Sequence, residues 1–64
     1  MSKKETYKKE LDKTIKELKQ LTQLLVETLE TTPIEFINLY EFISMVDTLN
    51  TKKQKLLYLI ATDI

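Results

Sequence analysis

The best-defined local signal in the sequence is Thr32-Pro33-Ile34-Glu35, near the middle of the chain. A threonine before a helix can accept a hydrogen bond from a free amide of the first turn, and a glutamate three residues later can reach back to it. Proline suits the first helical position and disfavours helical geometry at Thr32, the residue before it. The stretch therefore predicts that one helix ends near residue 30 and another begins at Pro33. A link this short makes the two helices antiparallel neighbours.

Before this stretch, apolar and threonine side chains recur at alternating steps of four and three, which places them on one face of a helix. The stripe consists of Leu11, Ile15, Leu18, Thr22, Leu25 and Leu29. Acidic and basic residues interleave at i, i+4, as in Glu5 with Lys9, and such pairs support a helix. We expect a first helix over about residues 4–30.

After this stretch, residues 33–50 predict a second helix with a broad apolar arc. The end of that helix has two interpretations. One long helix with a heptad register could continue through Asn50 to Leu57 and Ile60. Alternatively, Thr51 and Gln54 form a second capping box, which would start a third helix over about residues 51–62.

The last apolar run favours the second interpretation. In a straight hairpin, Leu56 to Ile60 would face residues 3–7, where Tyr7 is the one apolar side chain. Each large side chain left in water forfeits roughly 1.5–3 kcal/mol. We therefore expect a bend near Asn50 that folds the tail back onto the first two helices, or else coverage of the tail by another chain.

The fold class that follows is all-α. Residues 1–64 are predicted to form a single domain, an antiparallel helical hairpin with a third short helix or a bent C-terminal extension, which completes a helical bundle by association. The residues expected to form the core and the contact face are Leu18, Leu25, Leu29, Phe36, Leu39, Phe42, Ile43, Val46, Leu49, Leu56, Leu57 and Ile60. The residues expected to cap the helices are Thr32, Pro33, Glu35, Thr51 and Gln54.

The side chains present leave little for catalysis. The chain has no cysteine and no histidine, which excludes thiol nucleophiles, imidazole bases and zinc-finger ligand sets. Without glycine it has no phosphate-binding loop of the usual kind. Glu27 and Glu30 share a helix face, but two carboxylates without a histidine are more typical of a solvated surface than of a metal site. We predict no enzymatic activity, no catalytic or metal site, no cofactor and no small-molecule substrate.

The formal net charge is zero, but the charges are sorted along the chain: residues 1–20 sum to +3, residues 21–50 to −5 and residues 51–64 to +2. All ten basic residues are lysines, so no guanidinium is available to read a base. The lysines also alternate with acids, which is typical of a solvated helix. This pattern disfavours nucleic-acid binding, although a small DNA-binding regulator remains an alternative function that a titration at two salt concentrations would test.

Membrane segments are not expected. The longest apolar run, Leu56 to Ala61, is six residues long, whereas a membrane-spanning helix needs about twenty. Residues 1–10 lack the apolar stretch of a secretory signal. We expect a cytoplasmic protein that does not associate with membranes.

The surplus of apolar residues on short helices indicates the function. Small domains without disulfides or metals often obtain the missing burial by association. We expect a non-enzymatic protein–protein interaction or adaptor protein that acts through an apolar helical face, with a homodimer or a heterologous helical protein as its partner.

The closing segment, Leu56-Leu57-Tyr58-Leu59-Ile60-Ala61-Thr62-Asp63-Ile64, ends a helical hairpin of 64 residues. In this it resembles the small co-chaperone subunits of type III secretion needle proteins. The resemblance implies a cytoplasmic, chaperone-like hairpin that pairs with a helical-repeat co-chaperone and helps to keep a needle subunit from polymerising. A secretion co-chaperone is therefore another alternative function.

Overall fold

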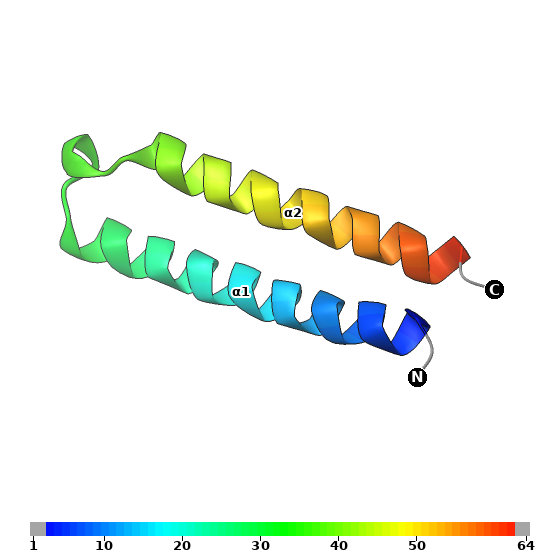
Figure 1. The fold of residues 1–64 in the computed structure, drawn as a ribbon. Helices are drawn as coiled ribbons and strands as arrows, with labels where there is room; N and C mark the ends of the chain where they lie inside the picture. Colours follow the sequence, from blue (N-terminus) through cyan, green and yellow to red (C-terminus); the bar gives the residue numbers. More distant parts are fainter. Residues whose placement is uncertain (1–2, 63–64) are drawn as a thin grey trace.

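The computed structural model describes residues 3–62 and shows two long antiparallel helices joined by a loop (Figure 1). Helix α1 spans Lys3–Thr31, the short 3-10 helix η1 spans Ile34–Phe36, and helix α2 spans Leu39–Thr62. No strand occurs within residues 3–62. The prediction of an all-α helical hairpin is confirmed.

The loop reverses the chain without a left-handed residue. No described residue has a positive φ, so the glycine turn that commonly ends a helix is replaced by extended residues around a 3-10 turn. Pro33 has φ −56° and ψ 140°, and Ile37 has φ −94° and ψ 128°. The amide of Ile37 donates to the carbonyl of Ile34 at 3.1 Å. The connection therefore occupies residues 32–38, longer than the predicted link.

The start of α2 differs from the prediction, because the helix begins at Leu39 and not at Pro33. The three residues predicted to cap it, Thr32, Pro33 and Glu35, lie in the loop and in η1, and no side-chain hydrogen bond caps η1. Instead, Asn38 Oδ1 accepts a hydrogen bond from the amide of Glu41 at 3.2 Å. Asn38 and Glu41 have the spacing of a capping box. Because asparagine is a stronger cap than threonine, α2 begins after Asn38 and not after Thr32.

The predicted bend near Asn50 is wrong, and so is the predicted third helix over residues 51–62. Helix α2 continues through Asn50 to Thr62 (Figure 1). Thr51 and Gln54 are exposed inside this helix and cap nothing.

The cover that α1 gives to the tail explains the straight helix. Leu59 lies beside Lys3 and Tyr7, and Ile60 lies beside Lys4 and Lys8. Lysine stems and the tyrosine ring can cover apolar surface while their polar ends stay in water. Leu59 and Ile60 are consequently half-buried. The sequence-based expectation considered Tyr7 alone and did not include the lysine stems.

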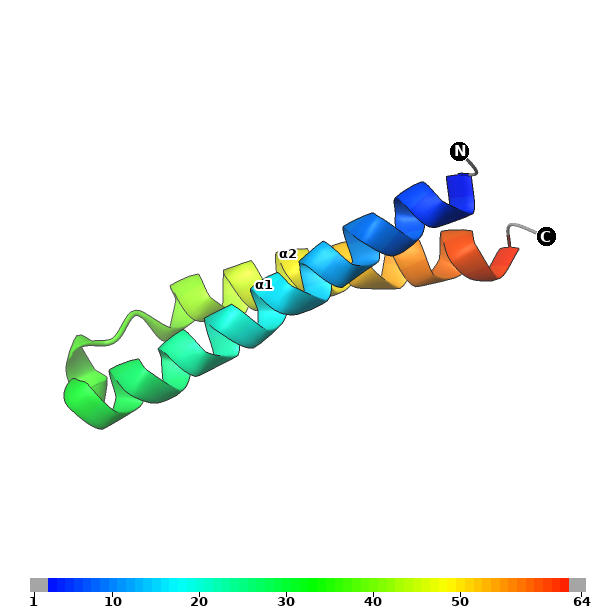
Figure 2. The same cartoon turned by 90° about the horizontal axis from the view of Figure 1, so that it is seen from below.

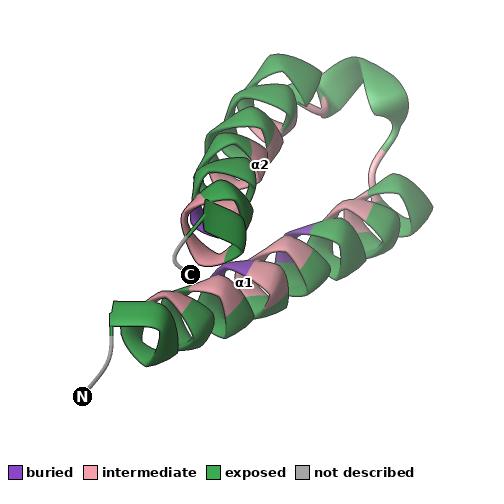
Figure 3. Ribbon diagram, turned by 90° about the vertical axis from the view of Figure 1, so that its right-hand side faces the viewer, coloured by how far each residue is buried: buried purple, intermediate pink, exposed green. Residues whose placement is uncertain are grey.

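The hairpin is a thin rod with a small core. Its extents are 49 × 16 × 12 Å and its Cα radius of gyration is 15.0 Å, whereas a compact domain of this length has about 11 Å. Among the described residues, Thr14 is fully buried, and Leu21 and Leu56 are each 7% exposed. Figure 3 shows that buried and half-buried positions follow the facing sides of the two helices. Two helices alone cover one strip each, so most of the surface of each helix stays in solvent.

The contact strip on α1 is rotated from the predicted stripe. Its buried or half-buried positions are Tyr7, Leu11, Thr14, Leu18, Leu21, Leu25 and Thr28, with Ile15 and Glu17 beside them. Thr22 and Leu29, two members of the predicted stripe, are exposed. The hydroxyls of Thr14 and Thr28 donate to the carbonyls four residues earlier, at 2.8 and 2.7 Å. Because the helix itself satisfies these hydroxyls, threonine can occupy the strip.

Candidate interaction surface

Exposed apolar side chains concentrate beside the loop. We call residues 21–50 the loop half, and residues 3–20 with 51–62 the open half. Of the eleven large apolar side chains that are exposed among the described residues, nine belong to the loop half. They are Leu24, Val26, Leu29, Ile34, Phe36, Leu39, Tyr40, Ile43 and Met45. The open half exposes Leu57 and Tyr58.

The path of the helices accounts for part of this difference. In Figure 2 the two ribbons cross at a shallow angle part-way along their length, and in Figure 3 they diverge toward the loop. Leu25 and Phe42, which belong to the loop half, are half-buried, whereas Leu56 in the open half is 7% exposed. The loop half therefore contains apolar side chains that the hairpin does not cover.

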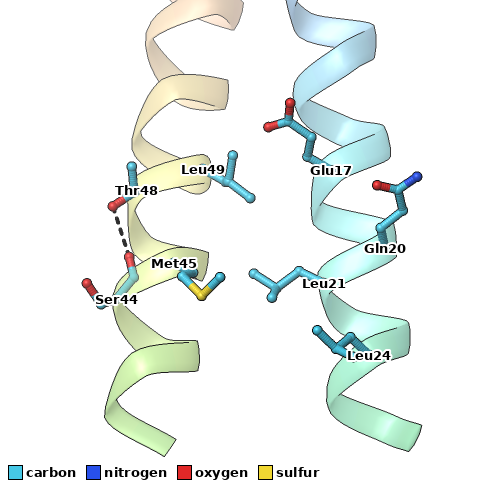
Figure 4. Close-up of a pocket in the computed structure, with 8 residues that line it drawn as sticks. All are labelled: Glu17, Gln20, Leu21, Leu24, Ser44, Met45, Thr48 and Leu49. Carbon is cyan, nitrogen blue, oxygen red and sulfur yellow. Dashed lines mark hydrogen bonds between the residues drawn. The ribbon is translucent and has the colours of Figure 1, made fainter.

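One flank of the loop half forms an open groove of about 500 Å³ between the helices (Figure 4). It is lined by Glu17, Gln20, Leu21, Leu24, Ser44, Met45, Thr48 and Leu49. Leu21 and Leu49 point from opposite helices into the space between them, with Met45 beside them. The Thr48 hydroxyl donates to the Ser44 carbonyl at 2.9 Å, so it is satisfied without a partner. The groove is mainly apolar, with polar groups at its edge.

The fold also separates charge along the rod. The hairpin brings the two basic segments, residues 3–20 and 51–62, to the same end, and it places the segment with five acids and no lysine at the other end. In the open half, Lys52 Nζ lies 3.5 Å from Glu10 Oε2, which links the two helices. The apolar loop half is therefore acidic, and the open half is basic.

The twelve residues predicted for the core and contact face divide into two groups. Those between the helices, half-buried or buried, are Leu18, Leu25, Phe42, Val46, Leu49, Leu56 and Ile60. Those exposed to solvent are Leu29, Phe36, Leu39, Ile43 and Leu57. The prediction missed Thr14 and Leu21, which are 0% and 7% exposed. A heptad count that admits threonine as a buried residue would have found both.

The described residues offer no other type of site. Within residues 3–62, no three acidic side chains lie together in a way that could hold a metal ion. Neither helix in that range has an apolar stretch long enough to cross a bilayer. Comparison of the chain with models of known protein families, with curated proteins and with solved structures found no match. Asp63 and Ile64, which close the segment that resembles secretion co-chaperones, lie outside the described residues.

Proposed function

We propose that this protein is a non-enzymatic interaction protein that binds a helical partner through the apolar side chains of its loop half. One observation carries the proposal: nine of the eleven exposed large apolar side chains among the described residues lie in this half. Exposed apolar side chains that gather in one part of a protein are typical of interaction sites. A helical partner suits the long, straight form of the exposed strips.

Several features support an interaction in place of catalysis. The chain lacks histidine and cysteine, and its two serines have no imidazole to activate them. The groove is mainly apolar, which does not suit a polar reaction centre. The cytoplasmic location expected from the sequence is part of the same proposal.

The proposal is tested by the stability of the dilute chain after apolar side chains are replaced by asparagine. Ile43 and Leu24 are 54% and 51% exposed, so Ile43→Asn and Leu24→Asn should change the free energy of unfolding by less than about 1 kcal/mol. Leu21→Asn, at 7% exposure and one turn before Leu24, is the matched control, which should lose most of its helix content. Circular dichroism during thermal unfolding measures all three.

If Ile43→Asn and Leu24→Asn unfolded the dilute chain as Leu21→Asn does, the exposed side chains would belong to the chain's own core. The proposal would then be wrong. Unchanged unfolding would show that the fold does not need these apolar groups, as the proposal requires.

A further inference from the structure

Helix α2 carries a second apolar stripe on the flank that lies away from the groove. Leu39, Ile43 and Leu57 are 40%, 54% and 44% exposed. At about 100° per residue they fall within roughly 40° of one another around the helix. The groove residue Thr48 lies roughly 180° from both leucines. The stripe therefore runs along α2 on the opposite side of the hairpin from the groove.

Helix α1 extends this stripe into a face. Val26 and Leu29, which are 49% and 47% exposed, lie roughly 200° and 140° around α1 from the groove residue Leu24. They are consequently on the same side of the hairpin as Leu39 and Ile43. We call these four residues with Leu57 the stripe face.

We propose that the stripe face binds a second copy of this chain in antiparallel orientation, with Leu39 of each copy level with Leu57 of the other. This inference rests on the proposed function and names its partner. A two-fold axis across the helices then brings α2 against α2 and α1 against α1 in a four-helix bundle. Asn50 lies near the centre of the α2 contact, where a polar residue can fix the register of packed helices.

Charge selects the antiparallel orientation. Residues 21–50 carry five acids and no lysine, whereas all ten lysines lie in the two segments at the other end of the rod. Antiparallel packing places the acidic loop half of each copy beside the basic open half of the other, and parallel packing would place like charges together. Complementary potentials of this kind set the orientation of association.

The exposed area fits a partner of this size. The chain exposes 5378 Å², whereas a compact monomer of 7.6 kDa exposes about 4,300 Å². The excess of about 1,100 Å² is comparable with the roughly 800 Å² that each partner loses in an interface of standard size. A second copy can therefore cover what the hairpin leaves exposed.

Sedimentation of the full chain over a range of concentrations tests whether the stripe face is the contact. The wild-type chain should form dimers, and Ile43→Asn should weaken dimerisation at least tenfold. Tyr58→Asn replaces an exposed side chain outside both the loop half and the stripe face, and it should leave dimerisation within about twofold of wild type. A wild-type chain that stayed monomeric to millimolar concentration would overturn the inference, as would a larger effect of Tyr58→Asn.

Distances between spin labels test the orientation. The chain has no cysteine, so Thr48→Cys and Thr62→Cys each give one labelled site per copy. In the proposed register residue 48 lies level with the two-fold axis, and the two copies of residue 62 are separated by about 42 Å along the axis at 1.5 Å per residue. The expected distance is therefore long for Thr62→Cys and much shorter for Thr48→Cys. Short distances at both sites would show parallel packing and overturn the inference.

These outcomes are separate from those of the proposed function. A chain that stays monomeric, but whose Ile43→Asn variant keeps its stability, would exclude the second copy as partner and leave the interaction surface in place. Loss of stability in dilute Ile43→Asn would instead contradict the proposed function itself.

Discussion

In the open half of the hairpin, α1 and α2 bury Thr14 and Leu56 and are linked by the ion pair of Glu10 with Lys52. In the loop half the same two helices diverge, and nine large apolar side chains stay exposed. The more apolar half is thus the less covered half. Two helices in contact can cover one strip each, so apolar side chains beyond that strip remain exposed however many the sequence supplies. The buried strip, which includes Thr14 and Leu56 in the open half and Leu21 in the loop half, holds the monomer together. The exposed apolar side chains of the loop half are available to a partner.

The largest effect on stability is expected at one of two adjacent leucines in the open half. Leu56 is 7% exposed and Leu57 is 44% exposed. Leu56→Ala should lower the free energy of unfolding by about 2–4 kcal/mol, because it removes buried methyl groups and leaves a cavity. Leu57→Ala should cost less than about 1 kcal/mol in dilute solution. Urea unfolding followed by circular dichroism measures both, and equal losses would show that the two helices do not face each other as described.

A smaller effect is expected where the loop joins α2. Asn38→Ala removes the side-chain acceptor of the Glu41 amide and should cost about 1 kcal/mol. Thr32→Ala is the control, since α2 does not begin beside Thr32, and it should cost less than about 0.5 kcal/mol. Thermal unfolding of the two variants ranks them. A larger loss of stability for Thr32→Ala would mean that Thr32 caps the helix, as the sequence predicts.

The hairpin itself could be predicted because its signals are local. Pro33 and the heptad spacing before it place the end of α1 within one residue of its position in the structure. The start of α2 could not be fixed in the same way, because Thr32 with Glu35 and Asn38 with Glu41 are two capping signals a few residues apart. Asparagine is the stronger cap of the two, and α2 begins after Asn38.

The contact strip and the course of α2 could not be predicted from local patterns, because both depend on contacts between the two helices. Thr14 was absent from the predicted core, yet it is buried with its hydroxyl satisfied by the Glu10 carbonyl, and the strip also includes Leu21. The bend at Asn50 was one of two expected ways to cover the leucines of the tail, the other being a second chain. In the structure Leu59 and Ile60 are half-buried against α1, and Leu57 stays exposed. The secretion co-chaperone and the DNA-binding regulator stay predictions.

The methyl group of the buried Thr14 should contribute more to stability than its hydroxyl does. Thr14 is 0% exposed, and its hydroxyl bonds to a carbonyl within its own helix. Thr14→Val keeps the shape and removes the hydroxyl, so stability should stay the same or rise by up to about 1 kcal/mol. Thr14→Ser keeps the hydroxyl and removes a buried methyl group, which should cost about 0.8 kcal/mol. The reverse order in thermal unfolding would mean that the hydroxyl, and not the methyl group, makes the important contact.

The smallest effect concerns the ion pair that links the helices in the open half. The side chains of Lys52 and Glu10 are 47% and 48% exposed, so water screens their attraction and both lose side-chain freedom on pairing. A double-mutant cycle with Glu10→Ala and Lys52→Ala should give a coupling of about 0.2–1 kcal/mol at low salt, and less in 1 M salt, where the screening length is about 3 Å. A coupling well above 1 kcal/mol that survives high salt would mean that charge holds the open half together. The burial of Thr14 and Leu56 would then contribute less to the stability of the open half than the ion pair does. The two halves would differ mainly in electrostatics and only secondarily in packing.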